Sequence, residues 1–296
     1  MTYLHERLSS GRYDRAAAHR GDAAWIDEHW GDPTSRVMVL AGTRIRPVDG
    51  AVGWISPADA PAGARMMLGV RDGIAHFAVV TAEEAATDDH LPLRSLLLTL
   101  SEDDAPLVLH AVGLAEWMRA TRFCARCGLP LNPAKEGHEL VCGRGHTTFP
   151  RTDPAVIMLI THGEPDTDDE RCLLGRQKAW PAGRFSTLAG FCEPGESLEG
   201  AVRREVFEET GVVVDEVAYF GNQPWPLPAS LMLGFTGRAT TTDIHCDEDE
   251  IEDARWFTRA ELRAGAHTSD LVLPGGVSIS RSLIESWLGE SLPGSW

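Results

Sequence analysis

The sequence predicts an α/β protein with more than one compact part. Three observations support this: short β-like runs separated by Gly, Pro and Asp turns, a continuous apolar strand pattern at 155–160, and a capped helix pattern at 197–211. The chain has 296 residues, which is enough for one large domain or two modest ones. Hydrophobic residues make up 43% and charged residues 24%, as in ordinary globular proteins.

The chain is strongly acidic, with 27 Lys and Arg against 44 Asp and Glu and a formal net charge of −17. Such a surface repels phosphate backbones and anionic membranes, which argues against a general nucleic-acid coat protein. It still allows a phosphate ligand that arrives with divalent cations. No apolar stretch approaches the ~20 residues that a membrane helix needs. The first twenty residues also lack the apolar core of a secretory signal, so we expect a cytoplasmic protein.

The first hundred residues show a β-rich pattern and no catalytic motif. Strand-like runs occur at 37–40, 66–70 and 74–80, separated by turns such as the Pro-Val-Asp-Gly segment at 47–50. A helix is expected next, at 106–121, because its apolar residues fall at roughly helical spacing.

A cluster of cysteines follows this helix. Cys124 and Cys127 form a CxxC half-site, in which two thiolates can hold one ion. A partner half-site should follow within ~15–20 residues, and Cys142 lies at that distance. A cysteine three residues later would complete the pattern, but that position is glycine, so His146 is the fourth candidate and His138 the alternative. Four protein ligands would make the Zn²⁺ structural. The competing interpretation is a metal-free ribbon held by leucine contacts.

A buried strand is expected at 155–160, where six apolar residues follow one another. The acidic segment 164–170 comes next. We expect it to form a solvated turn between two strands.

A helix is expected between Ser197 and Gly211. Serine is a favourable N-cap, and glycine can end a helix in the left-handed conformation. Within this helix, Arg204 can pair with a carboxylate such as Glu196 and so hold the preceding loop to the helix.

Three glutamates of this helix, Glu205, Glu208 and Glu209, fall at positions i, i+3 and i+4. They therefore occupy an arc of about 100° on one face. Carboxylates so placed repel each other unless a cation lies among them. Hard oxygen ligands suit Mg²⁺ or Mn²⁺, which also bind substrate phosphates. The alternative is an exposed acidic helix with an arginine partner.

The spacing from Gly190 to Val212 is G-x5-E-x7-R-E-U-x-E-E-x-G-U, where U is a bulky apolar residue. It resembles the box of the Nudix superfamily, which hydrolyses nucleoside diphosphates linked to another moiety. The resemblance implies an α/β/α sandwich that holds divalent metals on this helix. It implies Glu205, Glu208 and Glu209 as metal ligands, with one of them acting on the attacking water. It also implies that Gly190 offers its backbone carbonyl to a metal.

A proline-rich segment at 222–230 reads Asn-Gln-Pro-Trp-Pro-Leu-Pro-Ala-Ser. Three prolines around a tryptophan predict a stiff loop that presents a flat aromatic face. The segment resembles the SQPWPFPxS signature of NAD(H) pyrophosphatases within the superfamily, with Asn222 in place of serine and Leu227 in place of phenylalanine. That family also carries a zinc ribbon followed by a (Y/F)PR segment, which matches 149–151, and a decayed Nudix-like domain before the ribbon.

The resemblance therefore implies three parts. They are a degenerate Nudix-like N-terminal domain (1–105), a helix plus zinc-ribbon-like segment (106–148) and a catalytic Nudix domain (149–296).

The same resemblance implies a composite substrate site. Phe191 and Trp225 would sandwich the nicotinamide, with the tryptophan supplied by the partner subunit of a homodimer. Glu250 matches a further metal-binding or catalytic glutamate, and Glu252 is the neighbour that could be confused with it. The remaining substrate-binding candidates are Phe149, Gln223, Ser230 and Ser280.

The predicted activity is metal-assisted hydrolysis of the pyrophosphate in NADH or NAD⁺, with two or three Mg²⁺ or Mn²⁺ ions, giving nicotinamide mononucleotide and AMP. The same pocket would accept NAD at the 5′ end of an RNA, which predicts removal of the NAD cap. One alternative is a Nudix hydrolase of ADP-ribose or another dinucleotide. Another, from a different class, is an interaction module in which the zinc ribbon binds partners and the Nudix domain is catalytically inactive.

Overall fold

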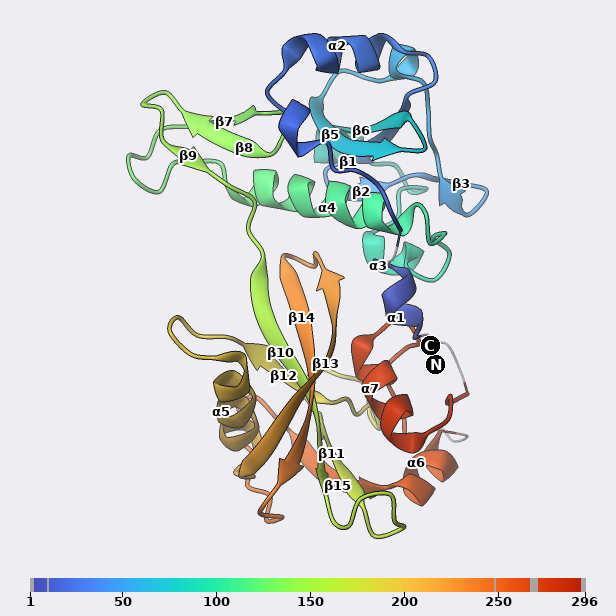
Figure 1. Cartoon of the computed structure of the whole chain (residues 1–296), viewed down its shortest axis with the longest axis vertical. Helices are drawn as coiled ribbons and strands as arrows, with labels where there is room; N and C mark the ends of the chain where they lie inside the picture. Colours follow the sequence, from blue (N-terminus) through green and yellow to red (C-terminus); the bar gives the residue numbers. More distant parts are fainter. Residues whose placement is uncertain (1–2, 10, 248, 267–270, 294–296) are drawn as a thin grey trace. The chain divides into compact units, whose positions relative to one another are not determined.

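The protein was analysed as a computed structural model that describes residues 3–9, 11–247, 249–266 and 271–293 (Figure 1). The chain forms two compact units. The C-terminal unit comprises Met1–Glu6, Asp153–Pro224 and Ser230–Trp296, and the N-terminal unit comprises Arg7–Thr152 and Trp225–Ala229. The predicted helix-plus-ribbon segment (106–148) thus belongs to the same unit as most of the first hundred residues.

A four-stranded sheet in the order β2-β1-β6-β5 forms the core of the N-terminal unit. β1 pairs in parallel with β6, whereas the β1–β2 and β5–β6 pairs are antiparallel. Each of the three strand-like runs predicted from the sequence lies within one of these strands. The strands are β1 (Arg36–Ala41), β2 (Arg44–Ile45), β5 (Ala64–Arg71) and β6 (Ile74–Thr81).

The N-terminal unit also contains short elements. They are the helices α2 (Ala23–Gly31) and α3 (Leu93–Leu96), the 3₁₀ helices η1 (Ala17–His19), η2 (Pro57–Asp59) and η3 (Glu83–Ala85), and the hairpin of β3 (Pro47–Val48) and β4 (Ala51–Val52). The short helix α1 (Leu4–Arg7) lies mostly in the C-terminal unit, to which the chain up to Glu6 belongs.

The longest helix of the N-terminal unit is α4 (Ala105–Ala120), which confirms the helix predicted at 106–121. Pro106 lies in its first turn, where the missing N–H needs no helical partner. Most of its residues are buried, and the helix packs against β5. A three-stranded antiparallel ribbon follows, formed by β7 (Leu131–Ala134), β8 (Glu139–Cys142) and β9 (Thr147–Thr148).

The C-terminal unit is built on a six-stranded sheet in the order β13-β14-β10-β11-β15, with β12 paired to β10. β10 runs parallel to β14 and antiparallel to β11 and β12. The strands are β10 (Asp153–His162), β11 (Arg171–Arg176), β12 (Leu188–Phe191), β13 (Val214–Trp225), β14 (Ser230–Ala239) and β15 (Asp253–Thr258). The helices are α5 (Leu198–Thr210), α6 (Arg259–Gly265) and α7 (Ile279–Leu288).

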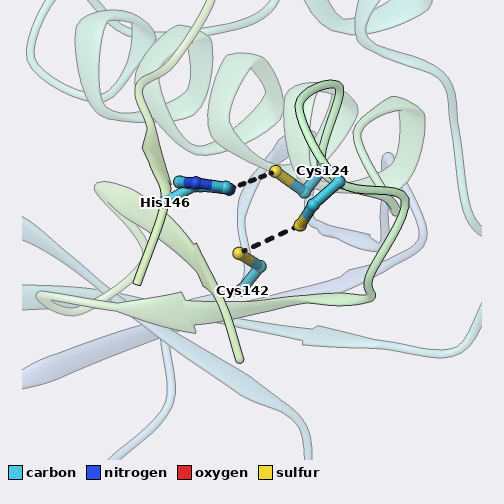
Figure 2. Close-up of side chains that lie close together, drawn as sticks. Cys124, Cys142 and His146 are labelled. Atoms are coloured by element: carbon cyan, nitrogen blue, oxygen red, sulfur yellow. Dashed lines mark hydrogen bonds between the residues drawn. The ribbon is translucent and has the colours of Figure 1, made fainter. Parts of the chain in front are cut away.

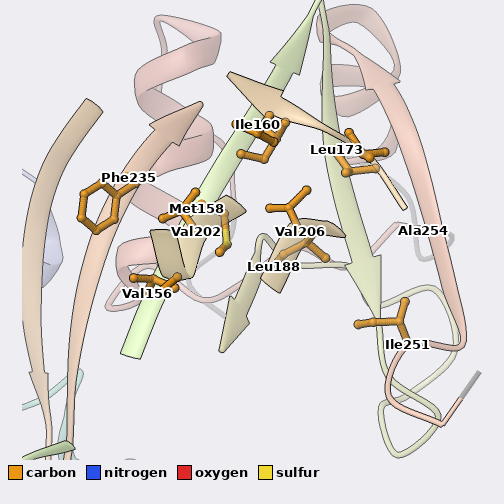
Figure 3. Close-up of a cluster of buried hydrophobic side chains, with 13 residues drawn as sticks. Val156, Met158, Ile160, Leu173, Leu188, Val202, Val206, Phe235, Ile251 and Ala254 are labelled. Carbon is orange, nitrogen blue, oxygen red and sulfur yellow. The ribbon is translucent and has the colours of Figure 1, made fainter. Parts of the chain in front are cut away.

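Both faces of β10 are covered by apolar clusters. Val156, Met158 and Ile160 pack with Val202 and Val206 of α5 (Figure 3). The alternate residues Ile157 and Leu159 belong to a second cluster with residues of α6 and α7. Strand side chains alternate between faces, so a strand buried on both faces reads as a continuous apolar run. The predicted buried strand and the α/β/α sandwich are therefore confirmed.

The acidic segment 164–170 forms a turn between β10 and β11, as predicted, but its last residue is not solvated. Glu170 is buried and accepts hydrogen bonds from Arg238 (2.9 Å) and Arg259 (2.7 Å). Burial alone raises the pKa of Glu170, but the hydrogen bond from Arg259 and its other donors outweigh this and hold the pKa below its usual value. The expectation of a fully solvated turn is corrected at this position.

The predicted loop at 222–230 is also corrected. Residues 222–225 are the last four residues of β13, and only 226–229 form the turn to β14. β13 is an edge strand, so Pro224 can lie within it without removing a hydrogen bond from the interior of the sheet.

Among the described residues, none of the helices combines the length and the hydrophobicity of a membrane-spanning segment.

Candidate active site and metal centre

The predicted glutamate helix is α5, and its two ends are capped as the sequence indicates. The Ser197 side chain accepts a hydrogen bond from the Gly200 N–H at 3.1 Å. Gly211 adopts the left-handed conformation (φ 71°) and donates its N–H to the Phe207 carbonyl at 2.8 Å. These caps fix where the helix begins and ends.

Arg204 connects the residues around the start of α5. It donates to Glu196 at 2.6 and 3.1 Å, which confirms the predicted pair. It also donates to Glu205 and Glu208, both at 2.9 Å, and to the backbone carbonyl of Phe191 at 2.9 Å. One guanidinium thus links the loop before α5, the end of β12 and two of the three predicted ligands.

The glutamates of α5 differ in their surroundings. Glu208 is exposed, whereas Glu205 and Glu209 are buried. Burial raises the pKa of Glu205, although hydrogen bonding from Arg204 opposes this shift. Burial, followed by the charges of Glu205, Glu250 and Glu208, raises the pKa of Glu209 to about 8. This site therefore concentrates negative charge and removes water from part of it.

Glu209 has a buried carboxylate oxygen whose hydrogen-bonding capacity is unsatisfied by the described residues. Its side chain is only 5% exposed, and its Oε2 atom is buried with no hydrogen-bond partner among the described residues. A buried carboxylate oxygen without a partner is costly unless a cation or donor reaches it. The residues present therefore fit a divalent cation, which would reverse the charge repulsion.

Gly190 makes room for one of these carboxylates. A side-chain carbon at this position would overlap the Glu205 carboxylate well inside van der Waals contact. The Glu205 carboxylate therefore lies directly against β12 at the residue predicted to offer a backbone carbonyl. This close approach explains why glycine stands inside the strand. The backbone of Gly190 is not left-handed, so the lack of space for a side chain is the reason.

The two acidic candidates at 250 and 252 have different environments. Glu252 forms an ion pair with Arg176. Glu250 is exposed, and its charge contributes to the raised pKa of both Glu205 and Glu209, so it lies close enough to act on them. This arrangement favours Glu250 as the additional carboxylate of the cluster.

The aromatic candidates lie in different units. Phe191 is in the C-terminal unit and is 56% exposed, although it is a large apolar side chain. Phe149, which is 63% exposed, and Trp225 belong to the N-terminal unit. The Arg94 guanidinium lies over the Trp225 ring, 5.9 Å from its centroid. The nicotinamide sandwich stays a prediction.

Two of the predicted nucleotide contacts form hydrogen bonds inside the C-terminal unit, and their contact with substrate stays a prediction. The buried Gln223 amide donates to the Val277 carbonyl at 2.6 Å and accepts from the Ile279 N–H at 2.9 Å. The buried Ser280 hydroxyl bonds both the backbone and the side chain of Thr187. Both residues hold the start of α7 in place, a role that the sequence did not indicate because the partners are distant along the chain. Ser230, the first residue of β14, is half-buried, and its role stays a prediction.

The cysteine cluster converges as the sequence predicts (Figure 2). The ligand atoms of Cys124, Cys127, Cys142 and His146 all lie within 4.8 Å of one another. Cys127 Sγ and Cys142 Sγ are 3.7 Å apart, close to the edge of about 3.8 Å expected for a tetrahedron with 2.3 Å zinc–sulfur bonds. Cys124 Sγ lies 3.4 Å from His146 Nδ1. The set suits a four-coordinate metal.

The alternative ligand, His138, points elsewhere. Its Nε2 lies 3.2 Å from His110 Nε2, and its Nδ1 lies 3.0 Å from the Glu136 carbonyl. Burial, the main cause, lowers the pKa of His138 to about 4 and that of His110 to about 2. This pair is therefore a neutral, buried contact separate from the cysteine cluster.

Comparison with known proteins identifies relatives that match most of the chain. The NUDIX domain family profile matches residues 151–274. The chain is 41% identical over 272 residues to "NAD-capped RNA hydrolase NudC" of Mycobacterium bovis (strain BCG / Pasteur 1173P2), an alignment that covers 86% of this chain and 84% of that protein. It is 43% identical over 212 residues to "NAD-capped RNA hydrolase NUDT12" of Macaca fascicularis, covering 67% of this chain but only 45% of that longer protein.

Among solved structures, a NUDIX hydrolase from Nitrosomonas europaea matches 58% of this chain and 96% of its own, with 20% identity and a TM-score of 0.43.

The position of Gly190 gives a direct test of the metal cluster. We expect Gly190→Ala to weaken Mn²⁺ binding at least about tenfold, because the new methyl group displaces the Glu205 carboxylate. Isothermal titration calorimetry measures this affinity. Gly221→Ala is the matched control, since this strand glycine of the same unit has its nearest atom at an ordinary 3.9 Å. Equal Mn²⁺ affinity in the two variants would contradict the assigned role.

Proposed function

The chain belongs to the Nudix family of hydrolases, and we propose that it hydrolyses the pyrophosphate bond of NADH or NAD⁺ and removes NAD caps from RNA 5′ ends. The observation that carries the proposal is the carboxylate cluster of α5, in which a buried oxygen of Glu209 has no hydrogen-bond partner among the described residues. The relatives named NAD-capped RNA hydrolases support the choice of substrate. Hydrolysis of free NADH or NAD⁺ gives nicotinamide mononucleotide, reduced in the case of NADH, and AMP. Hydrolysis of an NAD cap gives nicotinamide mononucleotide and an RNA that keeps the adenosine 5′-monophosphate at its end.

Residues of α5, of β12 and of the segment before β15 carry the proposed chemistry. Glu205, Glu208, Glu209, Glu250 and the Gly190 carbonyl would hold the divalent ions. Mg²⁺ or Mn²⁺, when bound, offsets the diphosphate charge and lowers the pKa of the attacking water. A carboxylate of this set accepts the proton from that water. Glu208 is the exposed member of the helix set, within reach of solvent, and Arg204 orients it at 2.9 Å.

Residues outside the cluster select the substrate. We propose that Phe191 stacks on the nicotinamide and that Trp225 of the partner subunit closes the other side, so that the active enzyme is a homodimer. The exposure of the Phe191 ring, beside a backbone carbonyl held by Arg204, supports this assignment. Phe149 and Ser230 are proposed nucleotide contacts. An NAD cap presents the same pyrophosphate and nicotinamide as free NAD, so one site serves both substrates.

A structural zinc completes the proposal. Cys124, Cys127, Cys142 and His146 would hold Zn²⁺ with four protein ligands and leave no open position for substrate. The ion would join the turn before β7 to the turn between β8 and β9, and so stabilise the ribbon.

The first test concerns the proposed catalytic carboxylates. We expect Glu208→Gln to lower kcat for NADH with Mg²⁺ or Mn²⁺ at least about 100-fold, because it removes a ligand and proton acceptor. Glu199→Gln is the matched control, since Glu199 is an exposed glutamate in the first turn of the same helix. Product analysis by chromatography measures both. Wild-type turnover in Glu208→Gln would refute the proposed mechanism.

The second test concerns zinc. We expect metal analysis to find about one zinc per chain in the wild type and well under one in His146→Ala. His138→Ala should keep its zinc, because His138 contacts His110 rather than the cysteines. A zinc-selective chelator, added with Mg²⁺ or Mn²⁺ in excess, should lower the melting temperature before it lowers initial activity. Equal zinc content in the two histidine variants would contradict the ligand assignment.

The third test concerns the composite site. Glu208→Gln and Trp225→Ala chains are each expected to be inactive, but subunits mixed at equal amounts should recover about a quarter of wild-type activity. Half of the dimers are then mixed, and one of their two sites is intact. The control is a mixture of Glu208→Gln and Glu209→Gln chains, which should recover no activity. In that mixture every chain carries one altered carboxylate cluster, so no site is intact in any dimer. No recovery in the first mixture would show that Trp225 is not supplied by the partner.

A further inference from the structure

The segment between α4 and β10 is a basic part of an acidic chain. Residues 121–152 contain five basic and two acidic side chains, a formal charge of +3, whereas the whole chain carries −17. Both acidic residues of this segment are already paired. Glu136 accepts two hydrogen bonds from Arg65, and Glu139 pairs with Lys135 at 2.8 Å. These two carboxylates therefore do not offset the charges of Arg122, Arg126 and Arg144.

Three exposed arginines lie in the segments that carry the ligands of the cysteine cluster. Arg122 lies two residues before Cys124, Arg126 directly precedes Cys127, and Arg144 lies in the turn between Cys142 and His146. The four ligand atoms of that cluster lie within 4.8 Å of one another, so the turns that carry these arginines meet at one centre. Their positive charge is concentrated there by the local fold.

Apolar side chains are exposed among these arginines. Phe123, between Arg122 and Cys124, is 64% exposed. Leu129 is 37% exposed, and its Cδ1 lies 3.8 Å from where a side-chain carbon on Gly143 would stand, so it borders the second turn of the cluster. An exposed phenylalanine beside arginines is a surface on which a base can stack while phosphates pair with the guanidinium groups.

We propose that this surface, the ribbon patch formed by Arg122, Phe123, Arg126, Leu129 and Arg144, binds the single-stranded RNA that follows the NAD cap. The inference rests on the proposed function for the choice of RNA, and on charge and exposure for the location. Arginine–phosphate pairing and base stacking do not depend on sequence, so the patch holds RNA without reading it. The acidic remainder of the chain repels RNA and leaves the patch as the favoured contact.

A binding experiment tests the patch without any hydrolysis. The probe is a short, unstructured, uncapped RNA with a fluorescent label, titrated by anisotropy between about 50 and 200 mM salt. We expect Arg126→Glu combined with Arg144→Glu to weaken binding at least about tenfold. Because single strands release ~0.7 ion per phosphate contact, the slope of log affinity against log salt should fall by about 1.4.

The matched control is Arg36→Glu combined with Arg44→Glu, two exposed arginines in strands of the same unit, which change the net charge by the same amount. Zinc content and melting temperature are measured for both double variants, so that loss of the fold is recognised. Phe123→Ala should weaken RNA binding about fivefold or more, and Phe123→Tyr should restore it, because tyrosine also stacks.

Kinetics then separate this inference from the proposed function. The patch variants should lower kcat/KM for NAD-capped RNA and leave kcat/KM for NADH unchanged. If the chain hydrolyses neither substrate but RNA binding still depends on the patch, the proposed function fails and the patch stands. If the patch variants bind RNA as the control does, the inference is overturned, and an acidic protein partner becomes the better candidate for this surface.

Discussion

Repulsion among the carboxylates at one end of α5 is the constraint on which the rest of the site depends. Glu205 and Glu209 are buried beside each other's charge, and the pKa of both is raised by that burial. Arg204 offsets part of the repulsion through Glu196, Glu205 and Glu208. It cannot satisfy the buried oxygen of Glu209. The residues present therefore fit a cation, which would neutralise the cluster.

Such a repulsive cluster requires a rigid support. β10 supplies it, because alternate side chains of this strand anchor α5 on one face and the α6–α7 layer on the other. β12 pairs with β10 and brings Gly190 against the Glu205 carboxylate. A residue with a side chain at 190 would push that carboxylate away. The packing of the sheet therefore fixes the position of the Glu205 carboxylate.

The features that the sequence predicted correctly are mostly local. Helix caps and the Arg204–Glu196 pair involve residues a few positions apart, so helical geometry alone brings them together. Other features depend on partners far along the chain. From the sequence, Glu170 is one acid of a solvated run, but the fold brings Arg238 of β14 and Arg259 of α6 to it. Gln223 and Ser280 matched a family pattern as substrate contacts, but the fold joins them to 277–279 and to Thr187 respectively. Propensity and spacing cannot foresee such contacts.

Net charge gives a misleading picture of this molecule, because its charges are unevenly distributed. The chain carries −17, yet residues 121–152 carry +3, and the charges of Glu205, Glu208 and Glu250 act on Glu209 where cations are expected. The two regions also differ in burial. Exposed arginine contacts are screened by salt over about 8–10 Å, whereas buried carboxylates are screened much less. The proposed binding of the diphosphate at α5 and the proposed contact of a longer RNA with the ribbon therefore depend on different charges. Negative side chains act through metal ions in one unit, and positive side chains act directly in the other.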